Sequence, residues 1–326
     1  GNRRNRSGGR RRGLSGDKGG RGSRDFRSGN SDGLRGSRRS QLVGGHGPVV
    51  LVPFPGDDPD VEIVPGLAEL RRHREPEHPV IIGGSLQQQR AGRCVKDLHG
   101  PLLDLIERIH RIPGLERIRL GSLEPRIITR EFAAELAKIP KLCPHFHLSL
   151  QSGCDETLKR MNRHYTTEDY AHRCEILRKY FENPAITTDV IVGFPQETEE
   201  EFETTREFLR RVHFYEMHVF KYSRREGTRA AVMEGQVPEQ EKNRRSDILL
   251  DLEAELSDAY RRSFLGKEEE VLLEERVSAE GRDYMIGHTR QYVKAVVPYR
   301  EGLKNVTVRG KLERMVTDEI LFLAEE

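Results

Sequence analysis

The sequence predicts an α/β protein, built on an α/β barrel or a doubly wound parallel sheet, with a small β-barrel at its C-terminal end. Helical and strand periods alternate four times between residues 96 and 222, which favours parallel strands joined by helices. After Gly266 the hydrophobic period changes to two, and five short apolar runs separated by turns indicate a β-barrel. The first 48 residues, in contrast, contain almost no large apolar side chain.

The first helix and strand pair begins near Lys96. Apolar residues over 102–112 follow a helical period that Pro113 and Gly114 end, and Ile118 begins a short strand. This strand stops at polar residues. In a parallel sheet, polar residues at the carboxyl end of a strand face the ligand crevice, so we expect ligand contacts at this edge.

The second and third pairs follow directly. A helix that begins near Thr129 leads into a strand at His145, whose apolar run stops at Gln151. Asp155 is available as the N-cap of the next helix, and Thr166 opens a further helix with an imperfect capping box. A solvated turn after the strand is the alternative to a ligand-binding edge at this position.

The last pairs complete the sheet. A buried parallel strand is expected over 186–195 and ends in a Gly/Pro turn. Thr198 and Glu201 form a capping box for the next helix, and 215–222 forms another strand. A long helix over 238–264 then leads to the β-barrel. Its five strands are expected near 271–273, 284–287, 292–297, 306–308 and 320–323.

Composition limits the class of protein. The 326 residues suffice for about two domains, and the net charge of +2 hides a concentration of positive charge near the N-terminus. No apolar run is long enough to span a membrane, and the first residues lack the apolar core of a signal peptide, so we expect a cytoplasmic protein. Four cysteines form no C-x-x-C pair, and Cys143, Cys154 and Cys174 are expected to be buried, reduced thiols.

The N-terminal part divides from the rest by composition. Residues 1–48 are rich in Arg and Gly and are expected to be disordered, either as an arm that contacts RNA phosphates or as a tail without a role. Residues 49–94 show no sustained period, although 80–82 is compatible with a strand. The α/β part then covers 95–262, and the C-terminal domain covers 263–326.

Five motifs occur in order along the α/β part. They are RIRLGSLEP at 117–125, HLSLQSG at 147–153, LKRMNR at 158–163, DVIVGFP at 189–195 and ETEEEF at 197–202. Together they resemble the tRNA methylthiotransferase family. Within it, the stretches 142–145 and 218–228 are most similar to the type that acts on threonylcarbamoyladenosine, the MtaB type. The resemblance covers about 96–326 and includes a C-terminal part similar to the TRAM RNA-binding domain.

The resemblance implies a reaction and its partners. Members of this family are radical S-adenosylmethionine enzymes with an incomplete α/β barrel. A [4Fe-4S] cluster reduces S-adenosylmethionine to a radical, and a second cluster in an N-terminal domain helps to supply sulfur. The radical abstracts hydrogen from C2 of the modified adenosine at position 37, so the implied partners are S-adenosylmethionine and the anticodon loop of tRNA, with no membrane.

The resemblance also implies site residues. Those on the S-adenosylmethionine side of the sheet are Ser122, Glu124, Gln151, Ser152, Asp189, Gly193 and Pro195. Arg163 is suited to the carboxylate of the cofactor, because a guanidinium binds carboxylates in a bidentate manner. In the C-terminal barrel, Arg290, Tyr292 and Lys294 combine phosphate neutralisation with base stacking, which is typical of RNA contacts. Turn geometry and a solvated, mixed-charge surface are the alternative roles.

The chain departs from the family in decisive places. The C-x-x-x-C-x-x-C motif that ligates the radical cluster is absent, and nothing before Cys94 resembles the family. Lys221 stands where the family has Pro, and Gln196 stands where Gly is usual, so both are expected to alter a turn near the pocket. None of the twelve histidines shows a metal-ligand spacing, and we expect no metal ligands in this sequence.

These departures favour an inactive chain, because the radical reaction requires the missing cluster. The abrupt change near Val95 is what translation in a wrong frame would give, and a frameshifted or truncated product is our first hypothesis. A natural, non-catalytic RNA-binding protein is the alternative. A different α/β enzyme would need a lysine or metal-binding carboxylates at the strand ends, where only Lys221 qualifies.

Overall fold

The computed structural model describes residues 80–82 and 99–325. The expectations for 1–48, for Cys94 and for most of 49–94 therefore lie outside the described residues. The chain divides into two units, 1–45 and 46–326, and every described residue belongs to the second. Among the described residues, no helix is long and apolar enough to cross a membrane.

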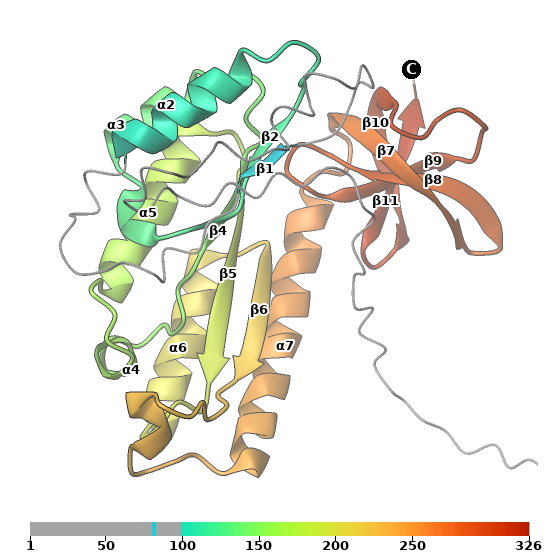
Figure 1. Ribbon diagram of the computed structural model, residues 1–326. Helices are drawn as coiled ribbons and strands as arrows, with labels where there is room; N and C mark the ends of the chain where they lie inside the picture. The colour runs from blue at the N-terminus through green and yellow to red at the C-terminus, as the bar shows by residue number, and fades with distance from the viewer. Residues whose placement is uncertain (1–79, 83–98, 326) are drawn as a thin grey trace, which may run out of the picture. The chain divides into compact units, whose positions relative to one another are not determined.

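A parallel sheet forms the centre of the α/β part (Figure 1). Strand β1 (Val80–Ile82) forms where the apolar run was compatible with a strand, and it pairs with β2 (Ile118–Leu120). A single glycine separates β2 from β3 (Ser122–Leu123), which begins a four-stranded parallel sheet. Its other strands follow in chain order as β4 (His145–Leu148), β5 (Ala185–Val192) and β6 (Glu216–Lys221). The predicted α/β class and the alternation of helix and strand are thus confirmed.

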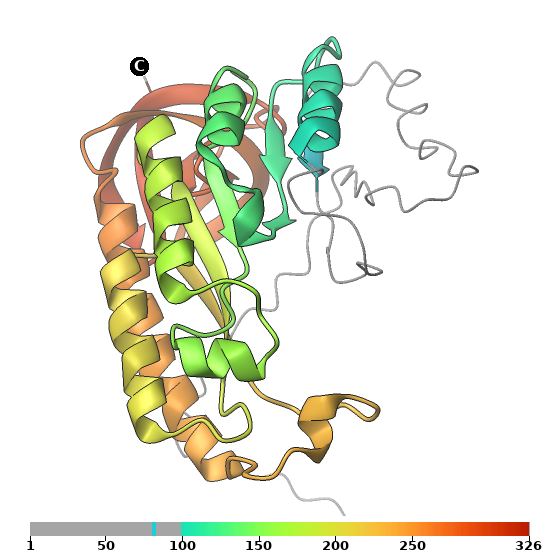
Figure 2. The ribbon, with the colours of Figure 1, turned by 90° about the vertical axis from the view of Figure 1, so that its left-hand side faces the viewer.

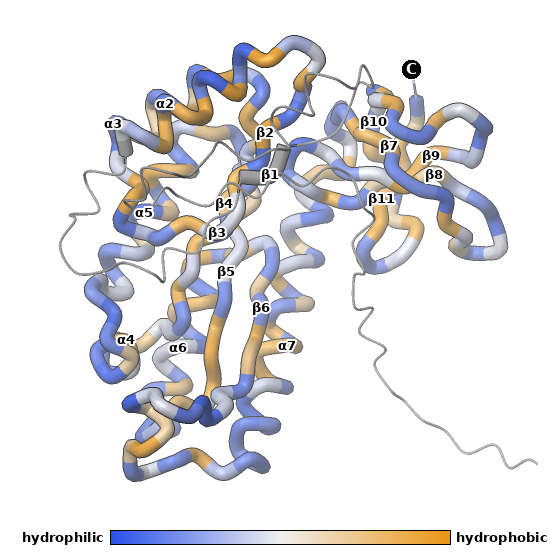
Figure 3. Tube along the Cα trace, viewed as in Figure 1, coloured by the Kyte–Doolittle hydropathy of each residue, from blue (hydrophilic) through white to orange (hydrophobic). Residues whose placement is uncertain are grey.

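Helices join these strands, as parallel crossovers require. They are α2 (His99–His110), α3 (Arg130–Ala137), α4 (Asp155–Arg160), α5 (Thr167–Tyr180) and α6 (Glu199–Val212), with the short 3₁₀ turn η3 (Pro125–Ile127). The 3₁₀ turn η4 (Arg229–Val232) and the long α7 (Glu239–Arg262) follow β6 and lead to the C-terminal part. Figure 2 shows α5 and α6 in front of the strands. Apolar side chains from the strands pack against these helices, and the carboxyl half of β5 is accordingly apolar in Figure 3.

The helix caps follow the sequence with one exception. Thr198 and Glu201 form the predicted capping box of α6, and Thr166 with Asp169 forms a complete reciprocal box at α5 rather than an imperfect one. Asp155 was expected to cap α4, and this is wrong, because the N-cap is the preceding cysteine, which makes no side-chain cap bond. The Asp155 carboxylate instead accepts a hydrogen bond from the Thr167 N–H (2.7 Å), at the start of α5.

The C-terminal part is a closed, five-stranded β-barrel. Its strands are β7 (Glu268–Ala279), β8 (Arg282–His288), β9 (Lys294–Pro298), β10 (Thr307–Thr317) and β11 (Ile320–Glu325). The first and fourth of these pair in antiparallel fashion and close the ring. Each of the five predicted strands is therefore present, and most extend beyond the short runs from which they were predicted.

The barrel contacts the amino ends of the parallel strands. Ala185 and Tyr215, which lie at the starts of β5 and β6, share one apolar cluster with residues of the barrel. The buried Arg117 guanidinium donates to the carbonyl oxygen of His288 (2.8 Å) and to the carboxylate of Glu270 (2.9 Å). These contacts fix the barrel against the sheet through both apolar packing and directional hydrogen bonds.

A stack of rings and guanidinium groups completes this contact. The Tyr292 ring lies 3.3 Å from the guanidinium carbon of Arg119 and stacks on the His288 ring, with centroids 4.0 Å apart. His145 meets the same ring at its edge, with a centroid distance of 5.6 Å. We call this set the docking end of the sheet. It comprises Arg117, Arg119, His145, His288 and Tyr292.

Candidate functional site

The carboxyl ends of neighbouring strands meet at one edge of the sheet, as the parallel order requires. The chain of β4 continues beyond the strand, so that the Gln151 N–H donates to the Asp189 carbonyl (2.8 Å) and the Ile191 N–H donates to the Gln151 carbonyl (2.9 Å). Gln151 itself has a positive φ of 74° and is buried. The sequence-predicted residues after β4 and β5 are therefore brought together.

A buried ion pair holds the turn after β5. Gly193 has a φ of +71°, and a Cβ at this position would lie 2.4 Å from the Cγ atom of Lys242. The Gly193 N–H donates to the Glu197 carboxylate (2.7 Å), which also accepts from Arg245 (2.8 Å). Because the pair is almost fully buried, it fixes the turn rather than facing a ligand.

The structure explains how the chain accommodates Gln196, one of the two departures from the family pattern. Gln196 has a φ of +65°, in the left-handed region that glycine adopts most easily, and its N–H donates to the Gly235 carbonyl (2.7 Å). The turn is thus kept despite the side chain. Lys221, the other departure, lies at the end of β6 and donates to the Asn243 side chain (2.7 Å). Its ammonium group also pairs with the Glu239 carboxylate (3.2 Å), so Lys221 makes contacts within the protein.

Two predicted cofactor contacts are engaged within the protein. The Ser152 hydroxyl is fully buried, bonds to the Thr205 hydroxyl of α6 (3.2 Å) and accepts from the Cys154 N–H (3.2 Å). Glu124 caps η3 and pairs with Arg126 (2.7 Å). Pro195 is buried, whereas Ser122 is exposed. The structure thus leaves Ser122 accessible, and cofactor binding by this set stays a prediction.

Arg163 lies beside the carboxyl edge with its charge available. It is half-buried and has no ion-pair partner among the residues described. Its neighbour Tyr165 donates to the carbonyl oxygens of Ser149 and Leu150, at 2.9 Å each. Burial raises the pKa of Tyr165 to about 12, although the positive charge of Arg163 acts in the opposite direction. A cation next to strand-end carbonyls is compatible with the predicted carboxylate contact.

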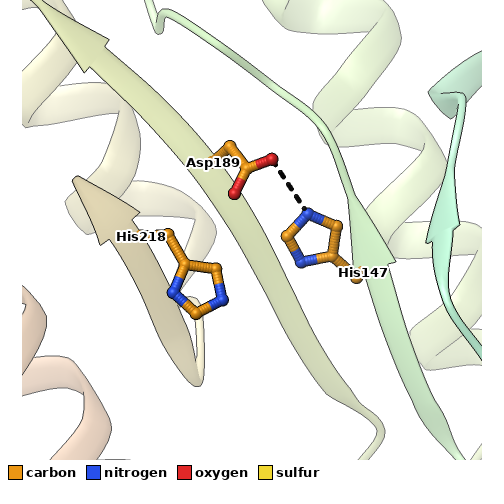
Figure 4. A group of neighbouring side chains, drawn as sticks. All are labelled: His147, Asp189 and His218. Carbon is orange, nitrogen blue, oxygen red and sulfur yellow. Dashed lines mark hydrogen bonds and ion pairs between the residues drawn. The ribbon is translucent and has the colours of Figure 1, made fainter. Parts of the chain in front are cut away.

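The other face of the sheet carries a polar group that the sequence did not reveal. Thr188 faces the helices, where Tyr170 of α5 approaches its hydroxyl, so the alternating Asp189 points to the opposite face. His147 of β4 and His218 of β6 project onto the same face from the two neighbouring strands (Figure 4). We call His147, Asp189 and His218 the open-face triad.

The triad is compact. His147 Nε2 lies 3.3 Å from the Asp189 carboxylate, and its Nδ1 lies 2.9 Å from the Thr187 hydroxyl. One ligand atom from each of the three side chains lies within 4.8 Å of the others. Burial alone would raise the pKa of Asp189, yet the hydrogen bond from His147 and the charges of His147 and His218 lower that pKa overall. Asp189 is therefore a carboxylate at neutral pH.

The expectation of no metal ligands rested on spacing along the chain, and the three residues of this triad are far apart in sequence. The signal that finds them is strand register, since Asp189 pairs directly with His218, and His147 pairs with Thr187, two residues before Asp189. The register of a parallel sheet depends on how the intervening helices pack, so it cannot be read from the spacing of residues along the sequence.

The thiols of the described residues do not fit an iron–sulfur cluster. Cys143 precedes β4, Cys154 follows it and Cys174 lies on α5, and all three are buried, as predicted. Burial raises the pKa of Cys143, and it raises that of Cys174 to about 12. A cluster needs several thiolates around one point. Among the residues that the structure describes, no such set of cysteines exists.

The predicted RNA contacts of the barrel are occupied by protein partners. The Arg290 guanidinium donates to the carbonyl oxygens of Pro140 and Leu142, the latter at 2.8 Å. Tyr292 belongs to the docking end, and Lys294 pairs with Glu319 (2.8 Å). The sequence did not anticipate these contacts, because they depend on how the barrel sits on the sheet. A role for the three residues in RNA binding stays a prediction.

Comparison with known proteins agrees with this fold. The profile of the Radical SAM superfamily matches residues 61–209. The described residues of this range, 80–82 and 99–209, thus belong to a radical S-adenosylmethionine fold. The sequence similarity begins upstream of the boundary that the motifs placed near Val95.

The relatives define the family more closely. Threonylcarbamoyladenosine tRNA methylthiotransferase MtaB from Thermotoga maritima is 39% identical over 203 residues, which is 62% of this chain and 46% of that protein. The corresponding Bacillus subtilis protein is 36% identical and covers 79% of this chain and 63% of its own length. A tRNA-2-methylthio-N(6)-dimethylallyladenosine synthase from Clostridium botulinum is 38% identical and covers 70% and 53%. The chain belongs to the tRNA methylthiotransferase family, is MtaB-like, and spans less than two thirds of these relatives.

Proposed function

We propose that this chain is a tRNA methylthiotransferase-like protein directed at N6-threonylcarbamoyladenosine 37 of tRNA, and that it does not carry out the radical reaction. Two of the relatives bear the name of the enzyme for this nucleoside, which supports the substrate. The dispersed thiols carry the second half of the proposal, because the cluster that activates S-adenosylmethionine has no set of ligands among the described residues.

We propose that S-adenosylmethionine binds at the carboxyl edge of the sheet. The half-buried Arg163 offers a guanidinium for its carboxylate, and the exposed Ser122 and partly exposed Asp189 offer polar groups near the same strands. When bound next to a cluster, the cofactor would supply the radical that removes hydrogen from the nucleoside. The described residues hold and orient it, and the turn fixed by the buried Glu197 and Arg245 keeps the edge in place.

The experiment separates cofactor binding from cofactor cleavage. The full chain is reconstituted anaerobically with iron and sulfide, then incubated with S-adenosylmethionine and a strong reductant. We expect bound S-adenosylmethionine but neither the absorbance of an iron–sulfur cluster nor 5′-deoxyadenosine. The Thermotoga maritima relative, treated in parallel, serves as the control for the reconstitution. Cluster absorbance together with 5′-deoxyadenosine from this chain would contradict the proposal.

We further propose that exposed cations of β10 contact tRNA. Arg309 and Lys311 are exposed on one side of this strand and Arg314 follows, while Lys311 has no ion-pair partner among the described residues. Replacing Lys311 and Arg314 together by Ala should weaken tRNA binding and reduce the salt slope by about 1.4 to 1.8, because each contacted phosphate releases counterions. Lys138→Ala, at the exposed C-cap of α3, is the matched control and should leave both unchanged.

A non-catalytic, cytoplasmic RNA-binding protein is the second candidate. The observation that favours it is the same dispersed set of thiols, because RNA binding requires no cluster. The two candidates differ in cofactor binding. If tRNA binds while equilibrium dialysis detects no S-adenosylmethionine, and Arg163→Ala changes nothing, the second candidate replaces the first.

A further inference from the structure

We propose that the open-face triad binds one divalent transition-metal ion, such as Zn²⁺ or Fe²⁺, through His147, Asp189 and His218. The inference shares Asp189 with the proposed cofactor edge, but its test needs neither S-adenosylmethionine nor tRNA. It rests on three side chains that face one another from three adjacent strands (Figure 4), with one ligand atom of each within 4.8 Å of the others. Among the described residues, no other group of His, Cys, Asp or Glu converges in this way.

The type of ligand selects the type of ion. Two imidazoles and one carboxylate suit Zn²⁺ and Fe²⁺, and three protein ligands leave positions open for water or substrate. Calcium and magnesium prefer sites made of oxygen atoms, so they fit this set poorly. The chemistry of the triad therefore indicates an accessible transition-metal site rather than a closed structural one.

The geometry needs only side-chain movement to hold an ion. Ligand atoms about 2.0 to 2.1 Å from a tetrahedral metal lie about 3.3 Å apart, which is closer than the present upper limit of 4.8 Å. The strands are fixed by continuous backbone pairing, including the direct register between Asp189 and His218. The proposal requires the exposed His218 ring to rotate toward the other two side chains while the backbone pairing stays unchanged.

A hydroxyl behind His147 orients that ring. The Thr187 hydroxyl lies 2.9 Å from His147 Nδ1, on the side of the ring away from Asp189. When Nδ1–H donates to this oxygen, Nε2 keeps its lone pair and points it at the carboxylate, where a metal ion would lie. Partners of this kind fix the tautomer of metal-binding histidines and typically contribute 10- to 100-fold to affinity.

A plain hydrogen bond between His147 and Asp189 is the competing explanation. It accounts for the 3.3 Å distance, but it assigns nothing to His218, whose ring forms no hydrogen bond with any other described residue. His218 nevertheless lies close to both, with its ring centroid 5.8 Å from that of His147. The two explanations differ in whether substitution of His218 changes metal binding.

Cobalt reports the site directly, because Co²⁺ substitutes for Zn²⁺ and gives visible absorption that depends on its ligands. The full chain is titrated with Co²⁺ under reducing conditions, followed by competition with Zn²⁺. We expect one equivalent to bind, and we expect His218→Ala and Asp189→Asn each to weaken binding at least about tenfold. Thr187→Val should weaken it by roughly 10-fold through loss of ring orientation.

The controls separate this site from other ligands of the chain. His164→Ala removes an exposed histidine outside the triad and should bind Co²⁺ as the parent does. His218→Cys should retain the ion and add an intense thiolate-to-cobalt absorption band, which a metal bound elsewhere would not acquire. Absence of stoichiometric binding overturns the proposal. Binding that survives both His218→Ala and Asp189→Asn overturns it as well, because the ion would then lie at another site.

Discussion

His145 and His147 lie two residues apart on the same face of β4, yet they belong to different environments. His145 is almost fully buried at the docking end, and its burial and the positive charge of Arg119 lower its pKa well below the usual range. His147 bonds to Thr187 and Asp189 on the open face, beside an exposed imidazole. One strand therefore serves two purposes within three residues.

The docking end and the open-face triad differ in how many of their polar groups have contacts within the protein. At the docking end, Arg117, Arg119 and Tyr292 contact protein atoms on the opposite side of the interface. In the open-face triad, His218 has no hydrogen bond within the described part of the chain. Polar groups with full sets of partners stabilise a fold, whereas an incomplete set is available for a ligand. Substitutions at the docking end should therefore destabilise the fold, whereas substitution of His218 should mainly change ligand binding.

The largest effect is expected at Arg117. Arg117→Ala leaves the carbonyl oxygens of His288 and Glu270 without their donor, and we expect the free energy of unfolding to fall by about 3 kcal/mol. Urea denaturation of the full chain measures it. Arg117→Lys is the matched control and should recover only part of the loss, because an ammonium group does not reproduce the planar fork. A loss below about 1 kcal/mol would show that the Arg117 hydrogen bonds contribute little to holding the barrel on the sheet.

The Tyr292 stack ranks second. Tyr292→Ala removes a ring that contacts Arg119, His288 and His145, and we expect a loss of about 2 kcal/mol, less than for a fully buried aromatic residue. Tyr299→Ala is the control. Tyr299 is also half-buried and lies under one guanidinium, that of Arg276 at 4.4 Å, so its loss should be smaller. Equal losses would show that the stack adds nothing beyond ring burial.

The sequence predicted correctly those elements of the fold that depend on residues close together in the chain. The two capping boxes at Thr166 and Thr198 need only residues three positions apart, and both are present. The five barrel strands were found from their alternating pattern. Asp155 was misassigned because a carboxylate at a helix start has two possible N–H partners, and the start of α5 lies close enough to compete.

The site was harder to predict because it depends on register and docking. Motif positions placed Gln151 and Gly193 at one edge correctly, since parallel strands share that edge. They did not show that Ser152 faces α6, or that Arg290 and Tyr292 pack against the sheet. The triad required the pairing of three strands that are separated by whole helices.

Glu253 on α7 extends the comparison of partnered and unpartnered polar groups to a carboxylate that lies near another negative charge. Burial and the negative charge of Glu216 raise its pKa to about 7. Because this value exceeds that of the unfolded chain, about 4.3, the native state binds the proton more tightly. The contribution of Glu253 to stability is present below about pH 4 and is lost as pH rises through 7.

Glu253→Gln should therefore become more stable than the parent as pH rises. We expect little difference near about pH 4 and a gain on the order of 1 kcal/mol near about pH 8, discounted because the side chain is partly exposed. Urea denaturation at both pH values measures it. Glu255→Gln is the control, since Glu255 is exposed and pairs with Arg210. A constant difference at both pH values would show that titration of Glu253 is not its cause.

The smallest effect is expected at His218, and it bears most directly on the comparison. Because the ring is exposed and has no hydrogen bond among the described residues, His218→Ala should change the free energy of unfolding by less than about 0.5 kcal/mol in metal-free buffer. The same measurement on His145→Ala should show a larger loss, since that ring is buried against Tyr292. With one equivalent of Zn²⁺ present, the parent should gain stability and His218→Ala should not, because an ion that binds only the folded state shifts the unfolding equilibrium by mass action. If His218→Ala instead destabilises the metal-free chain as much as His145→Ala does, the open face is as fully committed to the fold as the docking end, and the distinction between the two histidines of β4 fails.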